Sequence, residues 1–156
     1  MTKTNNTEQP QRERPAPGVK ATVGGPTIVF LTVCTQQRQK VLADTTTHAA
    51  LLAAWRDADA WKVGRYVVMP DHVHLFVSPT QRAVPLERWV RFWKNRFAVS
   101  TGRRAVWQAG GWHRRLRSAR HADEKWEYVE KNPVRAGLVD VASDWPFAGI
   151  LTCFDW

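Results

Sequence analysis

The chain has 156 residues, a length that suits one domain with a sizeable hydrophobic core. Its formal net charge of +9 and its pI near 10.3 indicate a polyanionic partner such as nucleic acid, because Lys and Arg gain affinity by releasing phosphate counterions. The sequence excludes a membrane-spanning protein and a disulfide scaffold, since no stretch approaches the roughly 20 apolar residues of a membrane span and only two cysteines are present.

The N-terminal segment, residues 1–20, is polar and has prolines among its arginines. Such a segment cannot bury enough apolar surface to order itself, so we predict a disordered basic tail. It is either a passive tail or an arm that touches nucleic acid once bound. Residues 21–156 are predicted to form one domain.

The remaining chain alternates between β-prone and helical patterns, with turn signals between them. The predicted elements are a strand at 27–35, a helix at 46–60, a hairpin at 64–78, a helix from Pro85 onward, a short strand at 106–108, a basic segment at 112–117, a helix at 122–131, and an aromatic C-terminal segment at 144–156 that packs back on the domain. This order is typical of an α+β fold, in which helices cover an antiparallel sheet in a ferredoxin-like or RNA-recognition layout.

The hairpin carries two histidines, His72 and His74, directly after a Pro-Asp turn. Side chains alternate between the two faces of a strand, so both imidazoles and Phe76 share one face, while the valines and the leucine between them share the other. Two imidazoles side by side on a rigid strand make half of a metal site. The alternative is a pair of structural histidines with ordinary hydrogen-bond partners.

The third helix carries Tyr128 and Asn132, which are four residues apart and therefore lie on one helical face. Two neutral imidazoles and an amide oxygen would suit Mg²⁺ or Mn²⁺ bridging to a phosphate oxygen. A tyrosine beside such a metal is a candidate nucleophile. The other tyrosine, Tyr66, lies within the strand before the turn, where we expect it to pack.

Taken together, these residues resemble the REP-associated tyrosine transposases, a group within the IS200-like family of single-tyrosine HUH nucleases. The resemblance covers most of the chain after the tail. The motifs that carry it are residues 30–35 with Arg38, residues 68–75, 107–108 and 116–118, and residues 128–139.

The resemblance implies an HUH endonuclease fold and roles for four residues. His72 and His74 match the metal-binding pair, and Asn132 matches the residue that completes the metal site. Tyr128 matches the nucleophile that attacks a DNA phosphodiester, leaving a 5′-phosphotyrosine link and a free 3′-hydroxyl in the course of DNA transposition and recombination.

The resemblance also implies a substrate and a setting. The family acts on single-stranded DNA hairpins from repetitive extragenic palindromes (REP), recognised by their structure and a short flanking sequence. We therefore expect a cytoplasmic, nucleoid-associated prokaryotic protein that works as a monomer, with a dimer as the alternative. The alternative function is a domesticated, non-catalytic protein that binds DNA or RNA hairpins.

Two basic groups and one aromatic side chain are the predicted DNA contacts. They are Arg88, Arg91 and Lys94 on the second helix, Arg114, Arg115 and Arg117 in the later basic segment, and Trp112 as a base-stacking residue. The alternative for the charges is a solvated face. The family usually has an acidic residue, and often a histidine, in the segment that here holds His113 and Arg114. We expect His113 to be exposed or to contact phosphate, and an additional metal ligand is the alternative.

Overall fold

The computed structural model describes residues 27–155, so the predicted tail over residues 1–20 lies outside the described residues. In chain order, the elements are β1 (Ile28–Cys34), the 3-10 turn η1 (Gln36–Arg38), α1 (Thr45–Asp57), β2 (Trp61–Met69), β3 (His72–Pro79), α2 (Leu86–Thr101), β4 (Trp112–Leu116), α3 (Ala119–Glu130), α4 (Asn132–Arg135), η2 (Ala142–Asp144) and β5 (Ala148–Ile150). Among the helices of this part of the chain, none is long and apolar enough to cross a membrane.

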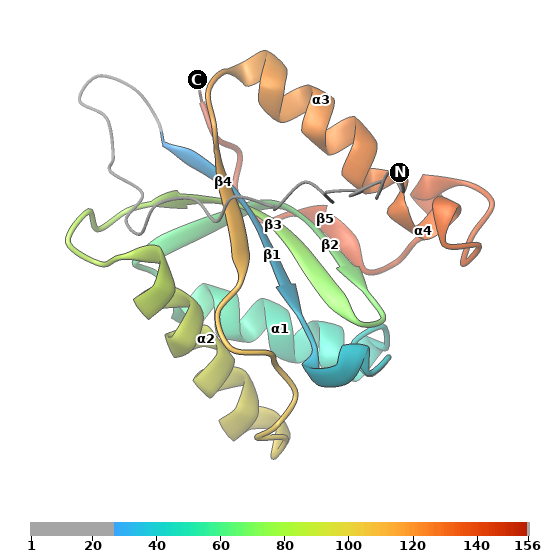
Figure 1. The fold of residues 1–156 in the computed structure, drawn as a ribbon, viewed down its shortest axis with the longest axis horizontal. Coiled ribbons are helices and arrows are strands. Elements are labelled where there is room, and N and C mark those ends of the chain that lie inside the picture. Colours follow the sequence, from blue (N-terminus) through green and yellow to red (C-terminus); the bar gives the residue numbers. More distant parts are fainter. Residues whose placement is uncertain (1–26, 156) are drawn as a thin grey trace, which may run out of the picture.

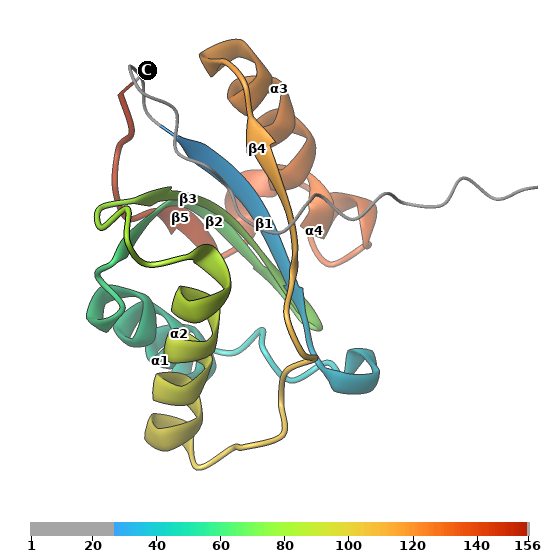
Figure 2. The same ribbon diagram turned by 60° about the vertical axis from the view of Figure 1, so that its left-hand side comes forward.

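The five strands form one sheet in the order β4-β1-β3-β2-β5, and every neighbouring pair is antiparallel. The connection from β1 through α1 to β2 leaves room for β3 between them, which is the split β-α-β arrangement of ferredoxin-like folds. Helices α1 and α2 cover one face of the sheet, and α3 and α4 lie on the other (Figures 1 and 2). The predicted α+β fold with an antiparallel sheet is confirmed.

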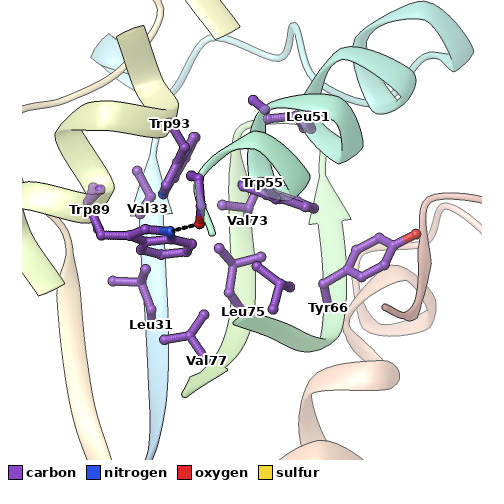
Figure 3. Packing of buried hydrophobic residues seen from close by; sticks show 14 of the residues in the cluster. Leu31, Val33, Leu51, Trp55, Tyr66, Val73, Leu75, Val77, Trp89 and Trp93 are labelled. Atoms are coloured by element: carbon purple, nitrogen blue, oxygen red, sulfur yellow. Dashed lines mark hydrogen bonds between the residues drawn. The ribbon is translucent and has the colours of Figure 1, made fainter. Parts of the chain in front are cut away.

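The face under α1 and α2 holds the larger hydrophobic core. The side chains that alternate with the histidines and Phe76 along β3 point into it, as strand alternation predicts, and meet tryptophans from both helices (Figure 3). These side chains are Val73, Leu75 and Val77. The indole of Trp89 also donates a hydrogen bond to the carbonyl oxygen of Ala58, at 2.6 Å (dashed in Figure 3). This core fixes the orientation of β3, and the side chains of His72 and His74 therefore point away from α1 and α2, toward the opposite face of the sheet.

A smaller core lies between the sheet and α3. Phe30, Val67 and Phe76 form its floor, and Val129 of α3 is almost fully buried against it. The ring of Trp126 packs edge-on against Phe76, with centroids 5.8 Å apart. Trp126 and Val129 thus hold α3 on the face of the sheet that carries His72 and His74.

Two parts of the sheet differ from the prediction. The strand expected at 106–108 is wrong, because that segment forms only an isolated bridge between Trp107 and Thr35. The strand that pairs with the outer edge of β1 is β4, which was predicted only as a basic segment. Edge strands commonly carry charged side chains, and the arginines of β4 hide the apolar alternation on which the strand prediction depends. The other addition, β5, is only three residues long and lies in the C-terminal segment expected to pack back.

Helix α3 begins and ends at identifiable capping residues. The side chain of Ser118 accepts a hydrogen bond from the backbone N–H of His121, so the helix begins before the predicted residue 122. It ends at Glu130, as Pro133 predicts, and this proline then lies in the first turn of the short helix α4.

Candidate active site

The two histidines of β3 point their Nε2 atoms at the same small volume. These atoms are 3.1 Å apart, and the ring planes are nearly perpendicular. Two ligands at right angles around a metal ion, each about 2.1 Å from it, would be separated by about 3.0 Å. The pair therefore has the spacing of two adjacent ligands in an octahedral site.

The other ring nitrogen of each histidine is held by an outer partner. The Nδ1 atom of His72 lies 2.7 Å from the carboxylate of Asp71, and the Nδ1 atom of His74 lies 2.8 Å from the hydroxyl of Thr32. Metal-binding histidines usually have such partners, which fix the ring orientation and leave Nε2 as the ligand. Thr32 reaches His74 because the two residues are paired across β1 and β3.

The turn η1 brings a cation to this arrangement. Gln37 and Arg38 both have positive φ values, 52° and 53°, a conformation that non-glycine residues rarely adopt. The turn points Arg38 back at the site, where its Nε donates to Asp71 at 2.9 Å and its Nη1 lies 3.1 Å from the sulfur of Cys34. Arg38 thereby fixes the carboxylate that in turn orients His72.

Burial determines the ionisation of these groups. Desolvation lowers the pKa of His72 against the opposing effect of Asp71, and it lowers the pKa of His74 to about 3, helped by the charges of His72 and Lys125. Burial alone would raise the pKa of Asp71, but hydrogen bonds with His72 and Arg38 outweigh it and lower that pKa. Both imidazoles are therefore neutral near pH 7, which is the form that binds metal.

We predict that the metal-free protein loses stability in mild acid. The unfolded chain protonates His74 below about pH 6.5, whereas the folded chain leaves it neutral until about pH 3. Because the unfolded state binds more protons in this window, the free energy of unfolding decreases as the pH is lowered. His74 alone should account for a decrease of about 2 kcal/mol between neutral pH and pH 5. Urea unfolding in EDTA at pH 7.5, 6 and 5 measures the slope. His74→Gln is expected to flatten it, and an equal slope in that variant would contradict the assignment.

The predicted nucleophile, Tyr128, lies on the exposed side of α3. The residue is 60% exposed, with the guanidinium of Arg135 over one face of its ring, 4.0 Å from the ring centroid, and the ammonium of Lys125 at 5.7 Å. Tyr66, by contrast, is buried, and its hydroxyl lies 2.9 Å from a ring nitrogen of His48. The expected packing of Tyr66 is confirmed, so among the described residues only Tyr128 offers an accessible phenol.

Asn132 is half-buried at the start of α4. The helical spacing predicted for Tyr128 and Asn132 is interrupted, because α3 ends at Glu130. A different contact brings the two residues together: Nη2 of Arg135 donates to the side-chain oxygen of Asn132 and, at 2.6 Å, to the backbone oxygen of Tyr128. The charges of Lys125 and Arg135 also reach His74, where they contribute to lowering its pKa.

The two imidazoles could hold a cation, and the amide oxygen of Asn132 is the predicted third ligand. Within residues 27–155, no three His, Cys, Asp or Glu side chains gather into a metal-binding group. Two neutral nitrogens and one neutral oxygen would leave positions open for water and phosphate oxygens and would leave the charge of the cation undiminished.

A basic and aromatic strip runs from Tyr128 to the edge of the sheet on this same face. We call it the β4–α3 strip, and it consists of Tyr128, Lys125, Phe30, Arg114 and Trp112. Lys125 lies over the ring of Phe30 at 4.6 Å, and the partly exposed Trp112 contacts that ring edge-on. The sequence-based prediction missed Lys125, although its position three residues before Tyr128 places both on one helical face.

The predicted contacts on α2 lie elsewhere. Arg88 and Arg91 are exposed on the helix that covers the opposite face of the sheet (Figure 2). Lys94 is bound within the protein: its ammonium donates to the backbone oxygens of Gln108 and Gly110 at 2.8 and 2.6 Å. The structure therefore assigns Lys94 to holding the loop before β4, which makes it a poor candidate for a DNA contact.

The basic segment at β4 is divided between the two faces because strand side chains alternate. Arg114 faces α3, whereas His113 and Arg115 are paired with core residues of β1 that face α2. Arg117 follows the strand and is exposed. The expectation that His113 is exposed is wrong, since it is half-buried and its Nε2 is enclosed without a hydrogen-bond partner in the described structure.

Comparison with known proteins shows which family the chain belongs to. Residues 27–131 match the IS200-like transposases, a range that includes both histidines and Tyr128. The chain belongs to the IS200-like transposase family. This IS200-like transposase is 29% identical over 123 residues to the REP-associated tyrosine transposase of Escherichia coli (strain K12), which covers 76% of the chain and 73% of that relative.

Two further comparisons agree. A putative REP-associated tyrosine transposase of Haemophilus influenzae (strain ATCC 51907 / DSM 11121 / KW20 / Rd) is 28% identical over 97 residues, covering 52% of the chain and 54% of the relative. The solved structure of a REP-associated tyrosine transposase bound to a REP hairpin superposes with a TM-score of 0.70 at 26% identity, covering 83% of the chain and 79% of that structure. The resemblance to this group is confirmed.

Proposed function

We propose that this transposase is a metal-dependent strand transferase that cleaves single-stranded DNA beside a REP-type hairpin and becomes linked to it through Tyr128. The observation that carries the proposal is the exposed phenol of Tyr128 on the same sheet face as two pre-oriented imidazoles. The hairpin substrate rests on the similarity to the transposase solved with a REP hairpin.

In the proposed reaction, Oη of Tyr128 attacks a phosphorus atom and its proton passes to solvent, which the exposed ring allows. The bond between phosphorus and the 3′-oxygen breaks, and that oxygen takes up a proton to become a free 3′-hydroxyl. A Mg²⁺ or Mn²⁺ ion held by His72, His74 and Asn132 would supply Lewis-acid polarisation of the phosphate. Since one phosphodiester replaces another, a 3′-hydroxyl can reverse the step without ATP.

The chain's own residues provide the remaining electrostatics. The cations of Lys125 and Arg135 flank the ring of Tyr128, where the negative charge of the attacked phosphate would come to lie. Arg114 extends this positive surface along the β4–α3 strip. Burial lowers the pKa of Lys125, and the charge of Arg114 lowers it further. The strip thus offers a path for the single strand between the nucleophile and Trp112.

We predict that Trp112→Ala weakens binding of a hairpin with a single-stranded extension by about 5- to 150-fold, because base stacking on an aromatic residue contributes ~1–3 kcal/mol. Fluorescence anisotropy of labelled hairpins measures the change. Phe92→Ala is the matched control, since Phe92 is 50% exposed but lies on α2, on the opposite face. Equal losses in the two variants would contradict the proposed path.

The proposed function is tested with the same hairpin labelled at either end, incubated with Mn²⁺ or EDTA and resolved on a denaturing gel. The 3′-labelled strand should migrate as a covalent protein adduct, whereas the 5′-labelled strand should give a shorter free product ending in a 3′-hydroxyl. Both products should require Mn²⁺. If neither forms while hairpin binding is intact across varied sequences, the chain is a non-catalytic hairpin-binding protein.

A further inference from the structure

Arg135 makes three contacts at the candidate active site, and the sequence-based prediction assigned it no role. Its guanidinium covers one face of the Tyr128 ring, and its Nη2 donates both to the backbone oxygen of Tyr128 and to the side-chain oxygen of Asn132. One side chain therefore connects the proposed nucleophile with the proposed third metal ligand across the break between α3 and α4. We propose that Arg135 is a positioning residue that holds Tyr128 and Asn132 in one arrangement.

The contact with Asn132 fixes the direction of its amide. An asparagine side chain can turn either its oxygen or its nitrogen toward a given point. A guanidinium has only donors, so it can form a hydrogen bond with the amide oxygen but not with the amide nitrogen. The carbonyl oxygen has two lone pairs, so one remains available for a cation after Arg135 has bound the other. Outer partners of this kind typically change metal affinity or activity by about 10- to 100-fold when they are removed.

The contact with Tyr128 restricts the nucleophile, whose ring is otherwise exposed. A guanidinium is planar, stacks on an aromatic face and forms several directed hydrogen bonds at once, whereas an ammonium is a point charge on a flexible stem. A lysine at this position could supply the charge but could not stack on the ring and bind both oxygens together.

The short helix that carries Arg135 is itself fixed at both ends. Pro133 is buried in its first turn, and the backbone N–H of Leu138 donates to the Pro133 oxygen at 2.9 Å. Gly137 adopts a positive φ of 72°, which allows the chain to turn back there. The base of the Arg135 side chain is therefore held in place, as a positioning role requires.

The first test reads the geometry directly, without activity. The chain has two tyrosines, so ring-labelled tyrosine gives two sets of NMR signals, with the buried Tyr66 as an internal reference. Arg135→Ala and Arg135→Lys should both shift the Tyr128 signals and leave those of Tyr66 unchanged. Arg82→Ala, which removes an exposed arginine from the loop before α2, should shift neither set. Unmoved Tyr128 signals in Arg135→Ala would overturn the proposal.

The second test reads the consequence and rests on the proposed function. Both Arg135 variants should lower Mn²⁺ affinity, measured by electron paramagnetic resonance, and the single-turnover rate of the covalent link, each by about 10- to 100-fold. In Arg135→Lys, which keeps the cation beside Tyr128, hairpin affinity should stay within about two-fold. Full recovery in Arg135→Lys would show that charge alone matters and would overturn the proposal. A wild-type protein that forms no covalent link would instead defeat the proposed function, while the NMR result would still decide the role of Arg135.

Discussion

Replacing Tyr128 with phenylalanine is expected to abolish the covalent DNA adduct, with a loss of more than about 10³-fold in the rate of cleavage. The substitution removes one oxygen atom and keeps the aromatic ring, so the contacts with Arg135 and Lys125 persist and the hairpin should bind with unchanged affinity. The rate is measured on a denaturing gel with the 3′-labelled hairpin, and the affinity by anisotropy on the same preparation.

The chain offers a matched control in its only other tyrosine. Tyr66→Phe also removes one phenolic oxygen, but from a buried residue whose hydroxyl contacts His48. It should retain the covalent reaction and lose about 1 kcal/mol of stability with that hydrogen bond. A persistent adduct in Tyr128→Phe, or its loss in Tyr66→Phe, would show that Tyr128 is not the nucleophile.

Replacing His74 with alanine is expected to lower Mn²⁺ affinity by at least about 100-fold and the cleavage rate by about 10³-fold. This imidazole is largely buried, neutral near pH 7 and directed at the Nε2 atom of His72, so its loss removes one of the two adjacent candidate ligands. Calorimetric titration with Mn²⁺ gives the affinity, and the gel assay gives the rate.

Two further variants should show a smaller loss of Mn²⁺ affinity and cleavage rate, or none. Thr32→Val keeps the shape of the side chain and removes only the hydroxyl that orients His74, so the loss should be about 10-fold. His121→Ala removes a histidine at the start of α3 and should change neither quantity, since this residue serves the helix through its backbone N–H. If His74→Ala behaves like His121→Ala, the histidine pair is structural.

Local patterns in the sequence were sufficient for much of the fold and for the centre of the site. Alternation along β3 depends only on the geometry of one strand, and it correctly separated both histidines from the core-facing valines. The buried side chains of α2 recur with the period of 3.6 residues that its sequence displays: Leu86, Trp89, Val90, Trp93 and Phe97. The proline after α3 located the end of that helix, and the apolar surroundings of Tyr66 predicted its burial.

Other features depend on contacts between segments far apart in the chain. The register between β1 and β3 alone sets Thr32 beside His74, and the turn η1 alone brings Arg38 to Asp71. A basic helix has the same sequence pattern whichever face of the sheet it covers, so only the tertiary structure shows that α2 covers the face opposite α3, the helix that carries Tyr128 (Figure 1).

What the sequence by itself determined was therefore the set of candidate residues: a tyrosine, two adjacent histidines and a nearby asparagine. The directions of the two histidine side chains follow from the alternation along a single strand, which a pattern of residues records. The tertiary structure decided how these groups are held, through Thr32 and Arg38 at the histidines and through Arg135 at Tyr128 and Asn132. Such partners are selected by packing and by strand register, which bring together residues whose separation in the sequence carries no regular period.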